Sequence, residues 1–278
     1  MKALVFLFFF NWETKTIFYI YKKNMRTKFL FALITLLPFV MNAQLKEIAY
    51  NDGNQKLSGF SAKSKREVVN KPGVLILPAW MGIDNHAKES ATQLAELGFY
   101  TFVADIYGVG NKPTNFKEAG EKAGYYKKNV LDYQRRIQLA LTELVKQGAN
   151  PDQIVIIGYC FGGTGAIEAA RSNMRVKGVV SFHGGLGKDE LRPFAAIEPK
   201  VLVLHGADDP YVPKEEIEAF QNEMRASKAD WQMVYYANAV HAFTDKYVGT
   251  DNSKGAAYNE LADKRSWQAM LDFLNELL

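Results

Sequence analysis

The chain has 278 residues, of which 48% are hydrophobic and 23% are charged, and its single cysteine is Cys160. This composition is typical of an ordinary globular protein and excludes low-complexity and repeat architectures. One cysteine also excludes an intramolecular disulfide, a zinc site built from several cysteines and a Cys-x-x-Cys redox pair.

The formal net charge of +4 comes from the amino-terminal 43 residues. Residues 44–278 carry 28 lysines and arginines against 29 aspartates and glutamates. Because an excess of positive charge is what attracts a phosphate backbone, we expect no nucleic-acid partner.

Residues 1–43 have the features of a targeting segment. A cationic stretch at residues 25–28 precedes an apolar run over residues 29–41, shorter than the roughly 20 residues that span a bilayer. This pattern predicts a signal peptide over residues 25–43, cleaved after Ala43. A periplasmic or secreted protein without stable membrane association would follow, and an uncleaved membrane anchor is the alternative.

Residues 44–278 predict a single domain in which strands and helices alternate. A hairpin is expected from residues 44–50 and 57–62, around the turn residues 51–54. Short apolar runs, typical of strands buried on both faces, follow at residues 74–77, 100–104, 154–157, 176–182, 201–205 and 232–236. Helical patterns cover residues 86–97, 117–147, 163–173, 214–225 and 256–278. The fold class is therefore α/β, with a mostly parallel sheet and helices on both faces.

The segment Gly158-Tyr-Cys160-Phe-Gly162-Gly163 lies between a predicted strand and a predicted helix. It has the form of a nucleophile elbow with cysteine at the nucleophile position. The amino terminus of the helix would favour the thiolate. The alternative is a buried cysteine that packs beside glycines.

A base and an acid follow in the chain order expected of this fold. Asp209 comes after the strand at residues 201–205, and His241 comes after the last strand. We expect His241 to accept the proton of Cys160 and Asp209 to orient the imidazole. Asp208 is the alternative acid, and a helix-capping histidine is the alternative role for His241.

Two further histidines, His183 and His205, also follow predicted strands, and we expect both to be packed rather than reactive. No histidine or carboxylate falls at metal-ligand spacing, so no metal is predicted. The glycines at 162, 163 and 165 lack the spacing of a dinucleotide site, so no cofactor is predicted either.

Four motifs together resemble the dienelactone hydrolase family of α/β-hydrolases, from about residue 51 to residue 278. They are Gly158-x-Cys160-x-Gly162-Gly163, Ser181-Phe-His-Gly-Gly185, His205-Gly-x-x-Asp209-x-x-Val212-Pro213 and His241-x-Phe243. The resemblance implies a triad of Cys160, His241 and Asp209 that acts on an ester or lactone. It also implies an oxyanion hole formed by the backbone N–H groups of Trp80 and Phe161.

The chain departs from that family at three positions. Ala79 stands where founding members have a glutamate that helps to activate the thiol, and Val109 and Asp245 stand where they have arginines for a substrate carboxylate. We therefore expect a small ester, thioester or lactone that is neutral, cationic or only weakly charged. An apolar pocket is expected from Trp80, Met81, Tyr107, Tyr211 and Phe243.

Other functions are compatible with the same residues. The triad could serve an acyltransferase or a peptidase, because an acyl-enzyme can be resolved by different nucleophiles. A non-catalytic binding or redox-sensing protein is the further alternative, since an exposed thiol of low pKa is open to oxidation.

Overall fold

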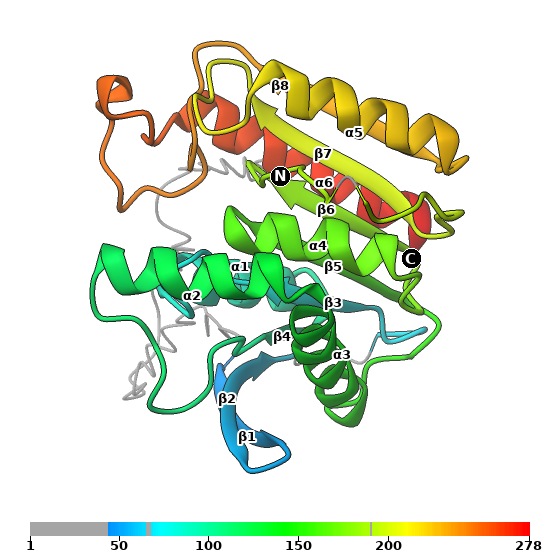
Figure 1. Cartoon of the computed structure of the whole chain (residues 1–278). Coiled ribbons are helices and arrows are strands. Elements are labelled where there is room, and N and C mark those ends of the chain that lie inside the picture. Colours follow the sequence, from blue (N-terminus) through cyan, green and yellow to red (C-terminus); the bar gives the residue numbers. More distant parts are fainter. Residues whose placement is uncertain (1–43, 65–67, 190) are drawn as a thin grey trace, which may run out of the picture. The chain divides into compact units, whose positions relative to one another are not determined.

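The computed structural model describes residues 44–64, 68–189 and 191–278. Within these residues, eight strands form one sheet in the order β1-β2-β4-β3-β5-β6-β7-β8 (Figure 1). The strands are β1 Lys46–Asp52, β2 Gln55–Ala62, β3 Gly73–Leu77, β4 Tyr100–Val103, β5 Ile154–Tyr159, β6 Gly178–Phe182, β7 Lys200–Gly206 and β8 Trp231–Tyr236.

The strands from β4 through β3, β5, β6 and β7 to β8 run parallel, whereas β1 and β2 add an antiparallel hairpin at one edge. Every residue of β3, β5 and β6 is buried. This burial explains why these strands are continuous apolar runs in the sequence. The predicted α/β fold with a mostly parallel sheet is confirmed.

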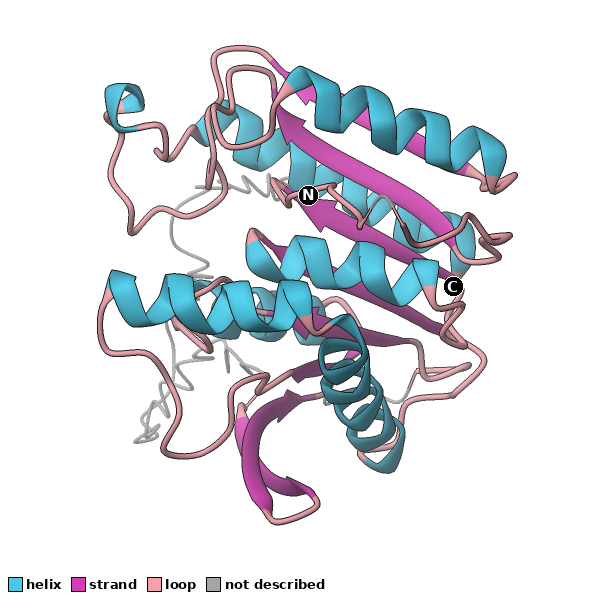
Figure 2. Cartoon of the chain, viewed as in Figure 1, coloured by secondary structure: helices cyan, strands magenta, loops and turns pink. Residues whose placement is uncertain are grey.

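Helices cover both faces of the sheet (Figure 2). They are α1 Asn85–Glu96, α2 Phe116–Lys128, α3 Val130–Lys146, α4 Phe161–Arg171, α5 Lys214–Ala226 and α6 Glu260–Leu277, with a short 3₁₀ helix η1 at Asn252–Lys254. Leu94 of α1 and Leu274 of α6 belong to the core on one face. Ile137 of α3, Ile167 of α4 and Met224 of α5 belong to the core on the other.

Two predicted helices differ from those observed. The predicted helix at residues 117–147 is two helices, because Asn129 leaves the helical region and donates from Nδ2 to the Tyr125 carbonyl at 2.9 Å. Such local side-chain bonds compete with helix formation. The last helix begins at Glu260 rather than residue 256, since Asn259 caps it by accepting from the Ala262 N–H at 3.1 Å.

The predicted targeting segment, residues 1–43, lies outside the described residues. None of the helices in the part of the chain that the structure describes is long and apolar enough to cross a membrane.

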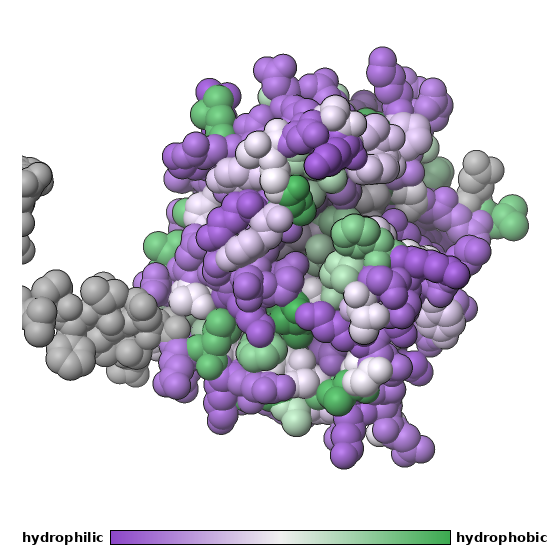
Figure 3. Space-filling model, turned by 90° about the vertical axis from the view of Figure 1, so that its left-hand side faces the viewer, coloured by the Kyte–Doolittle hydropathy of each residue, from purple (hydrophilic) through white to green (hydrophobic). Residues whose placement is uncertain are grey.

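The parallel strands all end at the same edge of the sheet, at the left of Figure 1. The loops that leave β3, β5, β7 and β8 therefore meet there, which is where ligands bind in open α/β sheets. Figure 3 looks onto this edge and shows apolar side chains gathered near its middle, inside a polar rim.

Candidate active site

Cys160 lies at the turn between β5 and α4, with φ 54° and ψ −114°. A positive φ is strained for any residue with a side chain, and such strain is typical of functional sites. The strain is held in place by a hydrogen bond of 3.0 Å from the Cys160 N–H to the Phe182 carbonyl at the end of β6. The turn therefore presents the thiol at the end of the sheet.

Two glycines make this turn sterically feasible. A Cβ atom on Gly158 would overlap the backbone of Gly162, and a Cβ atom on Gly162 would overlap the Leu77 carbonyl at the end of β3. The close approach of β3, β5 and α4 thus depends on the absence of both side chains, as the predicted elbow requires.

The structure brings together the three side chains expected to form the triad. His241 Nε2 lies 3.0 Å from Cys160 Sγ, and His241 Nδ1 lies 2.8 Å from Asp209 Oδ2. The Asp209 side chain has no exposed surface, and its Oδ1 accepts the Tyr211 N–H at 2.8 Å. Both carboxylate oxygens are therefore paired, which fixes the acid behind the imidazole.

The electrostatics of this chain favour a thiolate beside an imidazolium. Burial alone would raise the pKa of Cys160, but the hydrogen bond and the charge of His241 outweigh burial and lower it. Burial would likewise lower the pKa of His241, but its hydrogen bonds to Asp209 and Cys160 raise that pKa to about 10. Both shifts favour the form of the pair in which the proton resides on the imidazole.

The pH dependence of thiol alkylation is the first expected result. Because the pKa of Cys160 is lowered, its alkylation by iodoacetamide should keep its full rate as the pH falls below the ordinary thiol value of about 8.5. In His241→Gln the two largest contributions that lower the pKa of Cys160 are lost, while burial remains against the smaller contributions of the Phe161 N–H and Lys127, so the midpoint should move upward. A parent midpoint at or above the ordinary value would contradict the ion pair.

Asp208, the alternative acid, and His205, near the end of β7, are not part of this arrangement. Asp208 is exposed, and His241 is bonded to Asp209 instead. His205 is buried with its ring edge against Tyr235, and burial lowers its pKa.

Two backbone N–H groups were expected to bind an oxyanion. Phe161 is the first residue of α4, so its N–H has no acceptor within the helix. Trp80 lies in the turn after β3, where its carbonyl accepts the Tyr107 hydroxyl at 2.8 Å and its indole stacks on Phe116. Among the described residues no acceptor is bonded to the Trp80 N–H.

The expected substrate-contacting residues divide into two groups. Tyr211 is 59% exposed and sets its ring edge against His241 at 5.3 Å, and Met81 is half-buried in the turn beside Trp80. Phe243 was wrongly expected to line the pocket, since it has no exposed surface and packs in the core against Tyr236. The sequence of a loop does not reveal which of its side chains packs into the core and which faces the substrate.

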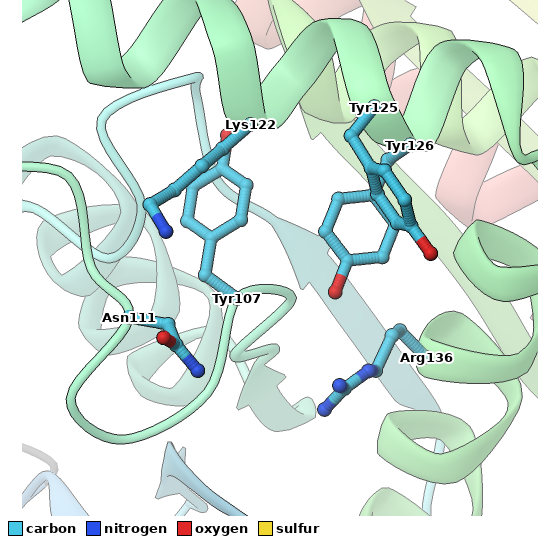
Figure 4. A pocket seen from close by; sticks show the side chains of 6 residues that line it. All are labelled: Tyr107, Asn111, Lys122, Tyr125, Tyr126 and Arg136. Carbon is cyan, nitrogen blue, oxygen red and sulfur yellow. The ribbon is translucent and has the colours of Figure 1, made fainter.

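Tyr107 is buried and stacks on Phe161 at 5.8 Å. The far side of its ring borders a pocket of ≈ 230 Å³ between the loop after β4 and helices α2 and α3 (Figure 4). This pocket is lined by Tyr107, Asn111, Lys122, Tyr125, Tyr126 and Arg136. Cys160 does not line this pocket.

The three departures from the family pattern all occur near the sheet edge. Ala79 supplies no carboxylate to the thiol, and Val109 is 54% exposed in the loop after β4. Asp245 lies close enough to Asp84 to help raise the pKa of that carboxyl, which is raised chiefly by burial. Lys127 in the last turn of α2 is a cation close enough to help lower the pKa of Cys160.

Sequence reasoning did not identify the polar side chains behind His241. His183 is 2% exposed and bonds Thr244 at 2.8 Å, and Thr244 in turn bonds His86 at 3.2 Å. The position of His183 after β6 was the only sequence feature that pointed to this network. Across residues 44–64, 68–189 and 191–278, no group of three or more His, Cys, Asp or Glu side chains could hold a metal ion.

Comparison with known proteins gives consistent matches over most of the chain. A protein of Yersinia pestis, provisionally assigned as a carboxymethylenebutenolidase, is 25% identical over 80% of this chain and 84% of its own length. A solved dienelactone hydrolase-like promiscuous phosphotriesterase from metagenomic libraries is 35% identical, with a TM-score of 0.80 over 85% of this chain and 99% of its own. A second solved structure, m3DLH, is 34% identical, with a TM-score of 0.81 over the same shares.

The model of the dienelactone hydrolase family matches residues 57–278. This range contains the elbow, the acid, the histidine and every strand from β3 to β8. The chain belongs to the dienelactone hydrolase family of hydrolases.

Proposed function

We propose that the protein hydrolyses a small ester, thioester or lactone through a triad of Cys160, His241 and Asp209. The observation that carries this proposal is the unbroken chain of short contacts, 3.0 Å from Sγ to Nε2 and 2.8 Å from Nδ1 to Oδ2. A nucleophile within reach of its base, and a base held by a buried acid, is the arrangement that covalent catalysis requires.

The mechanism follows from the positions of these groups. The Cys160 thiolate attacks the substrate carbonyl carbon, and the carbonyl oxygen becomes an oxyanion. This oxyanion accepts hydrogen bonds from the backbone N–H groups of Phe161 and Trp80. The intermediate then collapses to a thioacyl-enzyme as the leaving alcohol or thiol takes the proton of the His241 imidazolium. Neutral His241 next removes a proton from water, the hydroxide attacks the thioacyl carbon, and Cys160 leaves as the thiolate.

The surroundings of the thiol support a neutral or weakly charged substrate. Val109 offers no charge, and Asp245 would repel a carboxylate. A carboxylate could meet Lys127, but an ammonium lacks the bidentate geometry of an arginine. Without an arginine to pair with a substrate carboxylate, the site favours substrates that have no acid group.

A double charge substitution tests this assignment. The parent should have a higher kcat/KM for a neutral lactone than for the same lactone bearing a carboxylate. Val109→Arg with Asp245→Arg should raise kcat/KM for the carboxylate lactone by about 10-fold, equivalent to about 1.4 kcal/mol of transition-state binding. An unchanged or lower value would contradict the assignment of Val109 and Asp245 to the substrate-binding positions, and a parent that prefers the carboxylate lactone would contradict the proposed substrate class.

Phosphotriesters are a second candidate substrate class. The observation in favour is the 35% identity, over nearly the whole length of that protein, to the dienelactone hydrolase-like promiscuous phosphotriesterase. A p-nitrophenyl phosphotriester assayed beside a p-nitrophenyl ester would compare the two classes on one leaving group. Added amine or alcohol acceptors in the ester assay would reveal acyl transfer or peptidase-like chemistry, because they would divert the thioacyl-enzyme from water.

A further inference from the structure

A chain of three polar side chains lies directly behind His241. His183 Nε2 is 2.8 Å from Thr244 Oγ1, and Thr244 Oγ1 is 3.2 Å from His86 Nε2. His183 follows β6, Thr244 lies in the loop after β8, and His86 belongs to the first turn of α1. The Thr244 hydroxyl therefore ties the loop that carries His241 to two other elements.

His183 is held rigidly from several sides. It is 2% exposed, its φ is 40°, and its N–H donates to the Leu204 carbonyl of β7 at 2.9 Å. Its ring packs edge-to-face against His241 at 5.3 Å and against Phe243 at 5.2 Å. A polar ring is costly to bury without a hydrogen bond. The Thr244 hydroxyl supplies the hydrogen-bond partner of His183 Nε2.

The direction of the hydrogen bonds follows from the burial of His183. Nδ1 is buried without a partner in the described structure, so we assign the proton to Nε2, where it has an acceptor. His183 Nε2–H then donates to Thr244 Oγ1, and the hydroxyl proton is free to donate to His86. Burial lowers the pKa of His183 well below its usual value, which favours the neutral ring.

Hydrogen bonds hold the loop that carries His241 on both sides of the histidine. The His241 N–H and carbonyl are bonded to Gly255 and Ala257, at 3.2 Å and 3.0 Å. These bonds fix the main chain on one side of the histidine, but the next residue, Ala242, has a strained φ of 57°. On that side the Phe243 carbonyl accepts the Asn259 N–H at 3.0 Å and the Ala242 carbonyl accepts the Asp245 N–H at 2.9 Å. The Thr244 hydroxyl adds side-chain hydrogen bonds to His183 and His86 at the same place.

We propose that His183 is a positioning residue for His241. Its ring edge and its hydrogen bond to Thr244 keep His241 Nε2 aligned with the Cys160 sulfur. This inference rests on the proposed function, in which His241 is the base. Displacement of a catalytic group by about 1 Å can cost roughly 100-fold in rate, so a loosened loop should be visible in kcat.

Three substitutions and one control test the proposal. Thr244→Val keeps the shape and removes the hydroxyl, Thr244→Ser keeps the hydroxyl, and His183→Phe keeps a ring and removes both nitrogens. Thr142→Val is the control, because the Thr142 hydroxyl bonds only the Gln138 carbonyl on the exposed side of α3. The readouts are kcat and KM for a p-nitrophenyl ester, the pH midpoint of Cys160 alkylation, and the melting temperature.

Thr244→Val should lower kcat about 10-fold with KM within 2-fold, and it should move the alkylation midpoint upward. Thr244→Ser should have a kcat and an alkylation midpoint close to those of the parent. The double variant His183→Phe/Thr244→Val should be no worse than Thr244→Val alone, because Thr244→Val already removes the hydrogen bond that His183→Phe removes. Thr142→Val should match the parent.

Two results would overturn the proposal. One is a Thr244→Val protein whose kcat and alkylation midpoint equal those of the parent, even if it melts at a lower temperature, since this would indicate a purely structural role. The other is a Thr244→Ser protein impaired as much as Thr244→Val. Failure of the proposed function is distinguishable, because it would appear as a parent without ester hydrolysis while the alkylation midpoint still reports the alignment of His241 with Cys160.

Discussion

Replacing Cys160 or His241 by alanine should reduce ester hydrolysis by about 1,000-fold or more. Without the sulfur no thioacyl-enzyme forms, and without the imidazole the thiol keeps its proton and the leaving group receives none. The double variant should be no slower than either single variant, because the two side chains act as one unit. The measurement is kcat/KM for a short p-nitrophenyl ester, with the purified protein from Gln44 onward.

The acid offers a matched pair of substitutions. Asp209→Asn removes the charge behind His241 and permits the wrong imidazole tautomer, so it should also lower kcat by a large factor, up to about 10,000-fold. Asp208→Asn makes the same chemical change on the exposed neighbour, which does not bond His241, and should stay within about 2-fold of the parent. Equal effects at the two positions would contradict the assignment of the acid.

Gly162→Ala should prevent the elbow from forming. The added Cβ would overlap the Leu77 carbonyl, which belongs to the backbone of a fully buried strand and cannot move aside. The expected loss exceeds about 4 kcal/mol of unfolding free energy, a large share of the roughly 5–15 kcal/mol that stabilises a typical domain. Chemical denaturation would measure the loss, and failure to obtain folded protein would agree with it.

Gly124→Ala is the control for this substitution. Gly124 lies inside α2, and a Cβ atom there would meet nothing within 4 Å. Because alanine favours a helix more than glycine does, this change should stabilise the protein by up to about 1 kcal/mol. A Gly162→Ala protein as stable as the parent would contradict the packing described at the elbow.

Much of the fold could be predicted from the sequence because the sheet is buried on both faces. Strands β3, β5 and β6 contain no exposed residue, and Ser181 of β6 is the one polar residue among them, so their apolar runs are easily found. The break between α2 and α3 could not be predicted in the same way. It depends on one asparagine side chain that bonds the preceding turn, within a stretch whose hydrophobic period continues across it.

The candidate site was accessible to sequence reasoning where backbone and chain order constrain it. Gly158 and Gly162 define the elbow. The chain order of Cys160, Asp209 and His241 limits which residues can serve as the acid and the base for the thiol. Side-chain direction within loops is set by tertiary packing, which the sequence does not encode locally. Phe243 was therefore misplaced, and Thr244 gave no sign that its hydroxyl would join His183 to His86.

The central claim is that Cys160 carries the acyl group during turnover. The most direct test mixes the protein with excess p-nitrophenyl acetate, quenches in acid within the first turnover, and weighs the intact protein and its peptides by mass spectrometry. We expect one added acetyl group, found on the peptide that contains Cys160 and absent from Cys160→Ala. Full ester hydrolysis with no acetylated Cys160 at any time point, or with activity retained in Cys160→Ala, would contradict it.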